Sequence, residues 1–200
     1  MPWGVPEYAE QIYLLLEKLS VEKVNIVAHS FGGRVAIYLA SHYPEVVGKM
    51  IITGGAGIRK PASETQSKRQ KQYQKLKKLV LFFGRLPGCS GLTERLMAKL
   101  RERYGSPDYV RLNERMRATF VKVISQDLSE FLSDIQASTL LIWGSNDTET
   151  PLWMGQKMEK EIPDAGLVTF EGRSHFAFAE EPQRFLTIMK TFFEEGGSEQ

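Results

Sequence analysis

The amino-acid sequence predicts an α/β fold, in which a partial parallel sheet is flanked by helices. Short apolar runs typical of buried strands recur along the chain, helical patterns separate them, and glycine-rich or polar loops follow them. The strands are predicted at 24–28, about 49–53, 139–143 and 167–171, with crossing helices over 31–41, 152–161 and 182–194. A length of 200 residues, with 42% of them hydrophobic, is enough for one folded domain.

The first predicted element is a helix over 7–19. Its apolar residues recur at helical spacing, so they lie on one face of the helix. These residues are Ile12, Leu15, Leu16 and Leu19. The β-branched run 24–28 follows and ends in a sharp turn, after which the next helix begins at once.

Ser30 stands at this strand-to-helix turn, within Ala-His-Ser-Phe-Gly-Gly at 28–33. Such a turn strains the serine backbone, so the residues two positions to either side must be small. Ala28 departs from the strict Gly-x-Ser-x-Gly pattern but is small enough, and Gly32 fits it. Ser30 is therefore predicted as a nucleophile, with the backbone N–H of Phe31 directed at a developing oxyanion.

Two further polar residues follow later strands. Asp147 comes after strand 139–143, and His175 comes after strand 167–171. Because the carboxyl ends of parallel strands meet at one edge of a sheet, we expect both to lie near Ser30. Glu149 stays open as an alternative acid.

Two other features border this predicted site. His29, beside the serine, is expected to point into neighbouring structure. The glycine-rich loop after strand 49–53 lacks the lysine and hydroxyl of a phosphate-binding loop, so we expect it to pack closely near the site.

These segments resemble the α/β-hydrolase superfamily of the serine-nucleophile type and are similar to uncharacterised bacterial α/β-hydrolases. The resemblance rests on 28–33, on Leu-Ile-Trp-Gly-Ser-Asn-Asp at 141–147 and on Gly-Arg-Ser-His-Phe at 172–176. It covers nearly the whole chain, most loosely between 57 and 135. The chain order serine, aspartate, histidine is that of α/β-hydrolases. The resemblance implies this fold and hydrolytic chemistry, without naming a substrate.

The expected reaction is cleavage of a small carboxylic ester or related acyl substrate through an acyl-enzyme. His175 would take the proton of Ser30, and Asp147 would hold the required tautomer of His175. Neither a cofactor nor a metal is expected. A serine at position 30 argues against haloalkane dehalogenases and epoxide hydrolases, which use a carboxylate nucleophile in this fold.

Two alternatives to an esterase remain open. One is a related acyl-chemistry enzyme, either a carbon–carbon bond hydrolase or an acyltransferase. The other is an inactive, truncated hydrolase that serves as a binding or assembly module.

The resemblance also implies missing parts, because only about 23 residues precede the nucleophile strand, where the family has four strands. A His-Gly-type loop that supplies a second oxyanion donor would be absent with them, and losing one donor costs about 100- to 1000-fold in rate. Strand 24–28 would become an edge that is apolar on both faces. Such edges invite pairing, so we expect a tendency to form homo-oligomers.

The segment 57–135 lies where the family inserts a helical cap between two core segments, here 1–56 and 136–200. Residues 59–122 hold 17 basic and 5 acidic residues, a net charge of +12, whereas the rest of the chain carries −10. We predict helices over 67–83, 93–104 and 108–127. The basic excess is interpreted as a solvated face, because no nucleic-acid motif accompanies it. Attraction of anionic substrates is the alternative hypothesis.

Composition sets the remaining expectations. Cys89 is the single cysteine, which excludes an internal disulfide and suits a reducing compartment. We find no leader before the first helix and no apolar run of about 18 residues that could span a bilayer. The protein is therefore expected in the cytoplasm, with a small-molecule substrate and with neither nucleic acid nor membrane as a partner.

Overall fold

The computed structural model describes residues 1–60, 64–84, 90–105 and 107–194, and Cys89 lies outside them. The chain divides into two compact units. The sheet unit comprises Trp3–Arg59 and Ser125–Gln200 together with Met1. The helical unit comprises Lys60–Ile124 together with Pro2.

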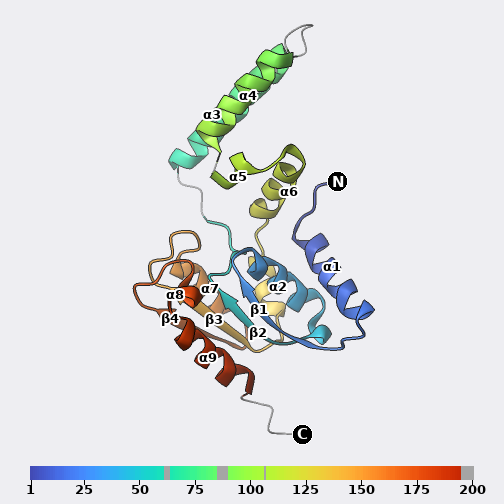
Figure 1. Cartoon of the computed structure of the whole chain (residues 1–200), viewed down its shortest axis with the longest axis vertical. Helices are drawn as coiled ribbons and strands as arrows, with labels where there is room; N and C mark the ends of the chain where they lie inside the picture. The colour runs from blue at the N-terminus through green and yellow to red at the C-terminus, as the bar shows by residue number, and fades with distance from the viewer. Residues whose placement is uncertain (61–63, 85–89, 106, 195–200) are drawn as a thin grey trace. The chain divides into compact units, whose positions relative to one another are not determined.

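The sheet unit contains the four predicted strands, and all of their pairings are parallel. They are β1 (Val24–His29), β2 (Val47–Thr53), β3 (Thr139–Gly144) and β4 (Ala165–Phe170). They pair in the order β1-β2-β3-β4, so β1 is an edge of the described sheet (Figure 1). The prediction of a parallel sheet flanked by helices is confirmed.

Four helices of the sheet unit lie close to the predicted positions. They are α1 (Val5–Lys18), α2 (Phe31–His42), α7 (Leu152–Glu161) and α9 (Pro182–Glu194). Three short helical segments were not predicted: η1 (Pro44–Val46), η2 (Ser129–Asp134) and α8 (Ala177–Glu180). α1 is held at its start by Glu7, whose carboxylate accepts a hydrogen bond from Gly4 N at 2.7 Å.

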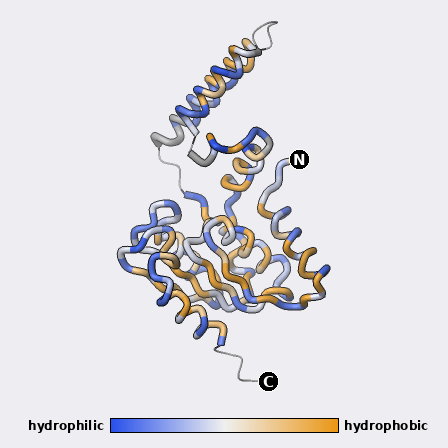
Figure 2. Tube along the Cα trace, viewed as in Figure 1, coloured by the Kyte–Doolittle hydropathy of each residue, from blue (hydrophilic) through white to orange (hydrophobic). Residues whose placement is uncertain are grey.

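Both faces of the sheet are covered, as the mostly hydrophobic strands require (Figure 2). On one face, Ile51, Ile142 and Phe170 pack with Phe185 of α9. On the other face, Trp143 is fully buried and lies so close to α7 that a Cβ at Gly155 would come within 2.9 Å of its ring. Alternation along each strand therefore divides the core between two helix layers.

The helical unit is built from α3 (Glu64–Phe83), α4 (Ser90–Tyr104), α5 (Pro107–Arg111) and α6 (Glu114–Ser125). α3 and α4 pack side by side (Figure 1). None of the described helices combines the length and apolar character needed to cross a membrane.

The prediction of one helix over 108–127 is wrong, because the chain breaks between α5 and α6. Asn113 Oδ1 accepts a hydrogen bond from Met116 N at 2.9 Å, which is the interaction of a helix N-cap. Arg117 donates to the carbonyls of Tyr109 and Val110, each at 3.2 Å, at the end of α5. Capping at both ends thus favours two helices over one.

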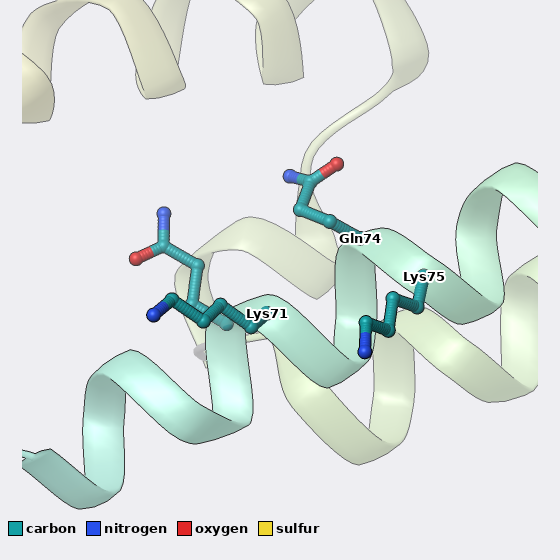
Figure 3. Close-up of a pocket in the computed structure, with 4 residues that line it drawn as sticks. Lys71, Gln74 and Lys75 are labelled. Atoms are coloured by element: carbon teal, nitrogen blue, oxygen red, sulfur yellow. The ribbon is translucent and has the colours of Figure 1, made fainter.

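Most basic residues of α3 that the structure describes are exposed, and Lys77 is half-buried. Lys71, Gln74 and Lys75 project from this one helix without converging on each other, and with Gln70 they line a surface hollow (Figure 3). The interpretation of these charges as a solvated face stays a prediction.

The edge of the sheet at β1 borders an apolar groove, to which α1, β1 and α2 all contribute. Its lining includes Ile12, Val27 and Phe31, and Val27 is 49% exposed. An apolar strand edge of this kind is able to pair with another strand.

Candidate active site

Ser30 lies in a strained turn between β1 and α2. Its φ of 49° and ψ of −111° place a non-glycine residue in a left-handed conformation. Neighbouring segments hold the turn, since Ser30 N donates to Thr53 O at 3.2 Å and Ser30 O accepts from Ala56 N at 2.9 Å. A Cβ at Gly32 would lie 3.6 Å from the Cβ of Ala28, so larger side chains at these positions would crowd the turn.

Phe31 is the first residue of α2, so its N–H has no acceptor within the helix. The positive end of the helix dipole lies at this N–H. These are the properties that an oxyanion donor requires. The Phe31 side chain is 41% exposed and packs edge-to-face on Tyr8, with ring centroids 5.1 Å apart.

Asp147 is held by the loop that follows β3. Its Oδ1 accepts hydrogen bonds from the backbone N–H groups of Glu149 and Thr150, both at 2.9 Å. Its Oδ2 accepts from Thr150 Oγ1 at 2.8 Å and lies 2.8 Å from His175 Nδ1. The side chain is fully buried, and these four contacts replace the water it has lost.

His175 is paired with Asp147 through one ring nitrogen only. In the tautomer that donates from Nδ1 to this carboxylate, Nε2 keeps its lone pair. Nε2 is buried, forms no hydrogen bond with the described residues, and lies 3.6 Å from Glu149 Oε2. A neutral imidazole with a free Nε2 can accept a proton from a nucleophile.

His29 points into neighbouring structure, as expected. Its Nδ1 lies 2.9 Å from both the carbonyl and the hydroxyl of Thr53. Its ring packs against the ring of His175, with centroids 4.6 Å apart. Burial lowers the pKa of His29, which favours the neutral imidazole. The contact also places His175 beside the end of β1, one residue before Ser30.

The structure thus joins Asp147 and His175 directly and brings His175 beside the Ser30 turn. Among the hydrogen bonds of the described residues, none joins the Ser30 hydroxyl to His175. Such bonds are often long before substrate binds. Glu149, the alternative acid, faces Nε2 rather than Nδ1, and its side chain is 66% exposed.

Two supporting residues had no assigned role in the sequence-based prediction. Thr150 Oγ1 lies 2.8 Å from Asp147 Oδ2 and 3.0 Å from Gly54 O, so its one proton can be donated to either oxygen. Gly54 has φ +49°, and a Cβ there would lie 3.1 Å from His175 Nδ1 and 3.2 Å from Asp147 Oδ2. The glycine-rich loop after β2 therefore packs closely near the site, as expected. The only signals in the sequence were a hydroxyl three residues after Asp147 and a glycine after β2.

No candidate metal-binding cluster is found among the described residues. Among these residues, no three histidine, cysteine or carboxylate side chains gather in a way that could hold an ion.

Comparison with known proteins identifies the family. The family model of the alpha/beta hydrolase fold matches residues 2–182. The chain therefore belongs to the α/β-hydrolase family, and its fold and resemblance to bacterial hydrolases are confirmed.

The curated relatives include enzymes named as hydrolases. A 2-hydroxy-6-oxononadienedioate/2-hydroxy-6-oxononatrienedioate hydrolase of Burkholderia vietnamiensis is 29% identical over 195 residues, covering 89% of this chain and 65% of the relative. A 2-hydroxy-6-oxo-6-phenylhexa-2,4-dienoate hydrolase of Comamonas testosteroni is 29% identical over 189 residues, with the same coverage of 89% and 65%. The chain thus spans about 65% of the length of these relatives.

Solved structures support the fold. A meta-cleavage product hydrolase from Pseudomonas fluorescens has a TM-score of 0.66 and 24% identity, covering 98% of this chain and 74% of the other. An esterase from Exiguobacterium antarcticum has a TM-score of 0.68 and 18% identity, covering 97% and 75%.

Proposed function

We propose that this protein is a serine hydrolase that cleaves an acyl substrate, a small carboxylic ester in the first instance. The observation that carries the proposal is the buried Asp147–His175 pair, which leaves Nε2 of His175 free beside the strained Ser30 turn. Serine needs such a base to become a nucleophile.

In the proposed reaction, Ser30 Oγ attacks the acyl carbon while His175 Nε2 takes the hydroxyl proton. Asp147 stabilises the imidazolium that forms, and the Phe31 N–H stabilises the oxyanion. The protonated His175 then gives its proton to the leaving alcohol, which leaves an acyl-enzyme on Ser30. Water activated by His175 releases the acid, so one ester and one water give one acid and one alcohol.

A carbon–carbon bond hydrolase is the second candidate. It is supported by the relatives that are 29% identical, whose names describe dienoate and dienedioate hydrolases. The dienoates and dienedioates of these names are carboxylates, and their cleavage would transfer the proton to a carbon leaving group. An acyltransferase and an inactive binding module stay open as further candidates.

We also propose that residues 57–135 form the helical cap of a single α/β-hydrolase domain and that the protein acts in the cytoplasm. The basic composition of 59–122 supports the cap, and the single cysteine is compatible with this compartment.

Hydrolysis of p-nitrophenyl acetate and butyrate tests the proposal. Ser30→Ala should lower kcat/KM by about 10³-fold or more, because the acyl-enzyme cannot form. A fluorophosphonate probe should label the wild-type protein and not this variant.

Ser41→Ala is the matched control. Ser41 lies on α2, and its hydroxyl bonds the carbonyl of Tyr38, so wild-type turnover and labelling are expected. Folded wild-type protein that neither turns over esters nor takes the label would reject the hydrolase and leave the binding module.

A further inference from the structure

Glu149 lies beside the ring nitrogen of His175 that acts as the base in the proposed reaction. Its Oε2 is 3.6 Å from His175 Nε2, the nitrogen that exchanges protons with Ser30 and with the leaving group in the proposed reaction. The position is built into the site, because Glu149 N donates to Asp147 Oδ1 at 2.9 Å. The backbone of Glu149 is therefore fixed to Asp147, and its side chain extends from there beside His175.

The charges around this point are predominantly negative. Asp147 faces Nδ1 of His175 and Glu149 faces Nε2, while His29, on the third side, has its pKa lowered by burial and favours the neutral form. Arg173 is near in sequence, but its Nε donates to Glu181 at 2.6 Å, so a carboxylate already opposes its charge.

We propose that Glu149 sets the charge preference of the site, so that acyl substrates without a negative charge near the reacting carbonyl are favoured over anionic ones. The inference rests on the proposed serine hydrolase function. An acyl substrate whose carbonyl lies between Ser30 and His175 Nε2 comes close to the Glu149 carboxylate. An anionic acyl chain would therefore meet repulsion from Glu149 as it enters.

This preference separates the two candidate functions. Neutral esters fit a site bordered by Glu149, whereas dienoate and dienedioate substrates would bring carboxylates toward it. The inference thus favours the ester hydrolase.

The test compares two esters that differ by one negative charge and one methyl group. Mono-p-nitrophenyl glutarate carries a terminal carboxylate, and its methyl ester is the neutral counterpart. The measured quantity is the ratio of kcat/KM for the neutral ester to that for the anionic ester at low ionic strength. Glu149→Gln should lower this ratio by about two- to fivefold, the range expected for a largely exposed charge, and Glu149→Lys should lower it further. The effect should shrink as sodium chloride is raised.

Glu22→Gln is the matched control, because Glu22 is exposed and precedes β1, at the opposite ends of the strands from the site. It should keep the wild-type ratio. Ser30-dependent turnover with the same ratio in wild type, Glu149→Gln and Glu149→Lys would overturn the inference alone. Absence of Ser30-dependent turnover with both esters would reject the proposed function, and the inference with it.

Discussion

His29 and His175 are neighbouring imidazoles with different partners, and His175 is the more deeply buried of the two. His175 bonds a carboxylate, whereas His29 bonds the carbonyl and hydroxyl of Thr53. The Thr53 carbonyl accepts from Nδ1 of His29 and raises the pKa of this ring, but burial, which lowers the pKa, is the larger effect. His29 is therefore held neutral by burial beside the candidate base.

This lowered pKa predicts how stability depends on pH. Above about pH 6.5, the pKa of an unfolded histidine, His29 is neutral in both states and adds no pH dependence. As pH falls below that value, the unfolded state binds a proton first, so stability is lost down to the lower pKa of the folded state. His29→Asn, which cannot titrate, should therefore lose less stability between about pH 7.5 and 5.5.

Urea unfolding at a series of pH values measures this difference. His29→Gln, which also cannot titrate, should behave in the same way. Equal losses of stability in wild type and both variants would contradict the assignment of this pH dependence to His29.

The loop after β2 packs directly against the candidate site. Gly54 turns there with a positive φ, its N–H donates to Ile142 O at 3.0 Å, and its carbonyl lies 3.0 Å from Thr150 Oγ1. The loop can therefore pass directly against the Asp147–His175 pair. Only a residue without a Cβ satisfies both the conformation and the space.

Gly54→Ala should destabilise the protein by about 1–2 kcal/mol through backbone strain, and it should also lower ester turnover at least about tenfold. The second effect arises because the new Cβ would lie 3.1 Å from His175 Nδ1. Denaturant unfolding and kcat/KM measure the two effects separately.

Gly172→Ala distinguishes strain from crowding. Gly172 has φ +74°, but a Cβ there would meet nothing within 4 Å. This variant should show the stability loss with near wild-type turnover. Equal turnover in the two variants would argue against a role for close packing at Gly54.

The expected homo-oligomer depends on β1 as the edge of the described sheet. The edge presents backbone groups next to an apolar groove, and Val27 is half exposed within it. Self-association through this edge stays a prediction, and a charge on the strand should oppose it.

Val27→Lys should lower the concentration-dependent mass measured by light scattering. Val121→Lys on α6 is a matched control, because the two valines are exposed to 49% and 48%. A wild-type protein that stays monomeric at high concentration would contradict the prediction, as would equal effects of the two substitutions.

Local patterns were sufficient to predict most elements of this fold. β-branched runs and the small residues around Ser30 depend on backbone sterics over a few positions, so strands and the turn could be placed within about two residues. The prediction was wrong over 108–127, where periodicity continues but the caps at Asn113 and Arg117 end one helix and begin another. A single polar side chain can end or begin a helix. Hydrophobic periodicity depends on the apolar residues alone, so it does not detect such a break.

The sequence by itself determined the strand-to-helix turn at Ser30, the strand ends that carry Asp147 and His175, and the parallel sheet that brings strand ends to one edge. Only the tertiary structure decided how their side chains meet. It paired Asp147 Oδ2 with His175 Nδ1 across 28 residues, placed Thr150 and Gly54 against the pair, and turned Glu149 toward Nε2. The physical reason is that residue order dictates local backbone geometry, whereas contacts between loops depend on sheet register and on packing over long sequence separations.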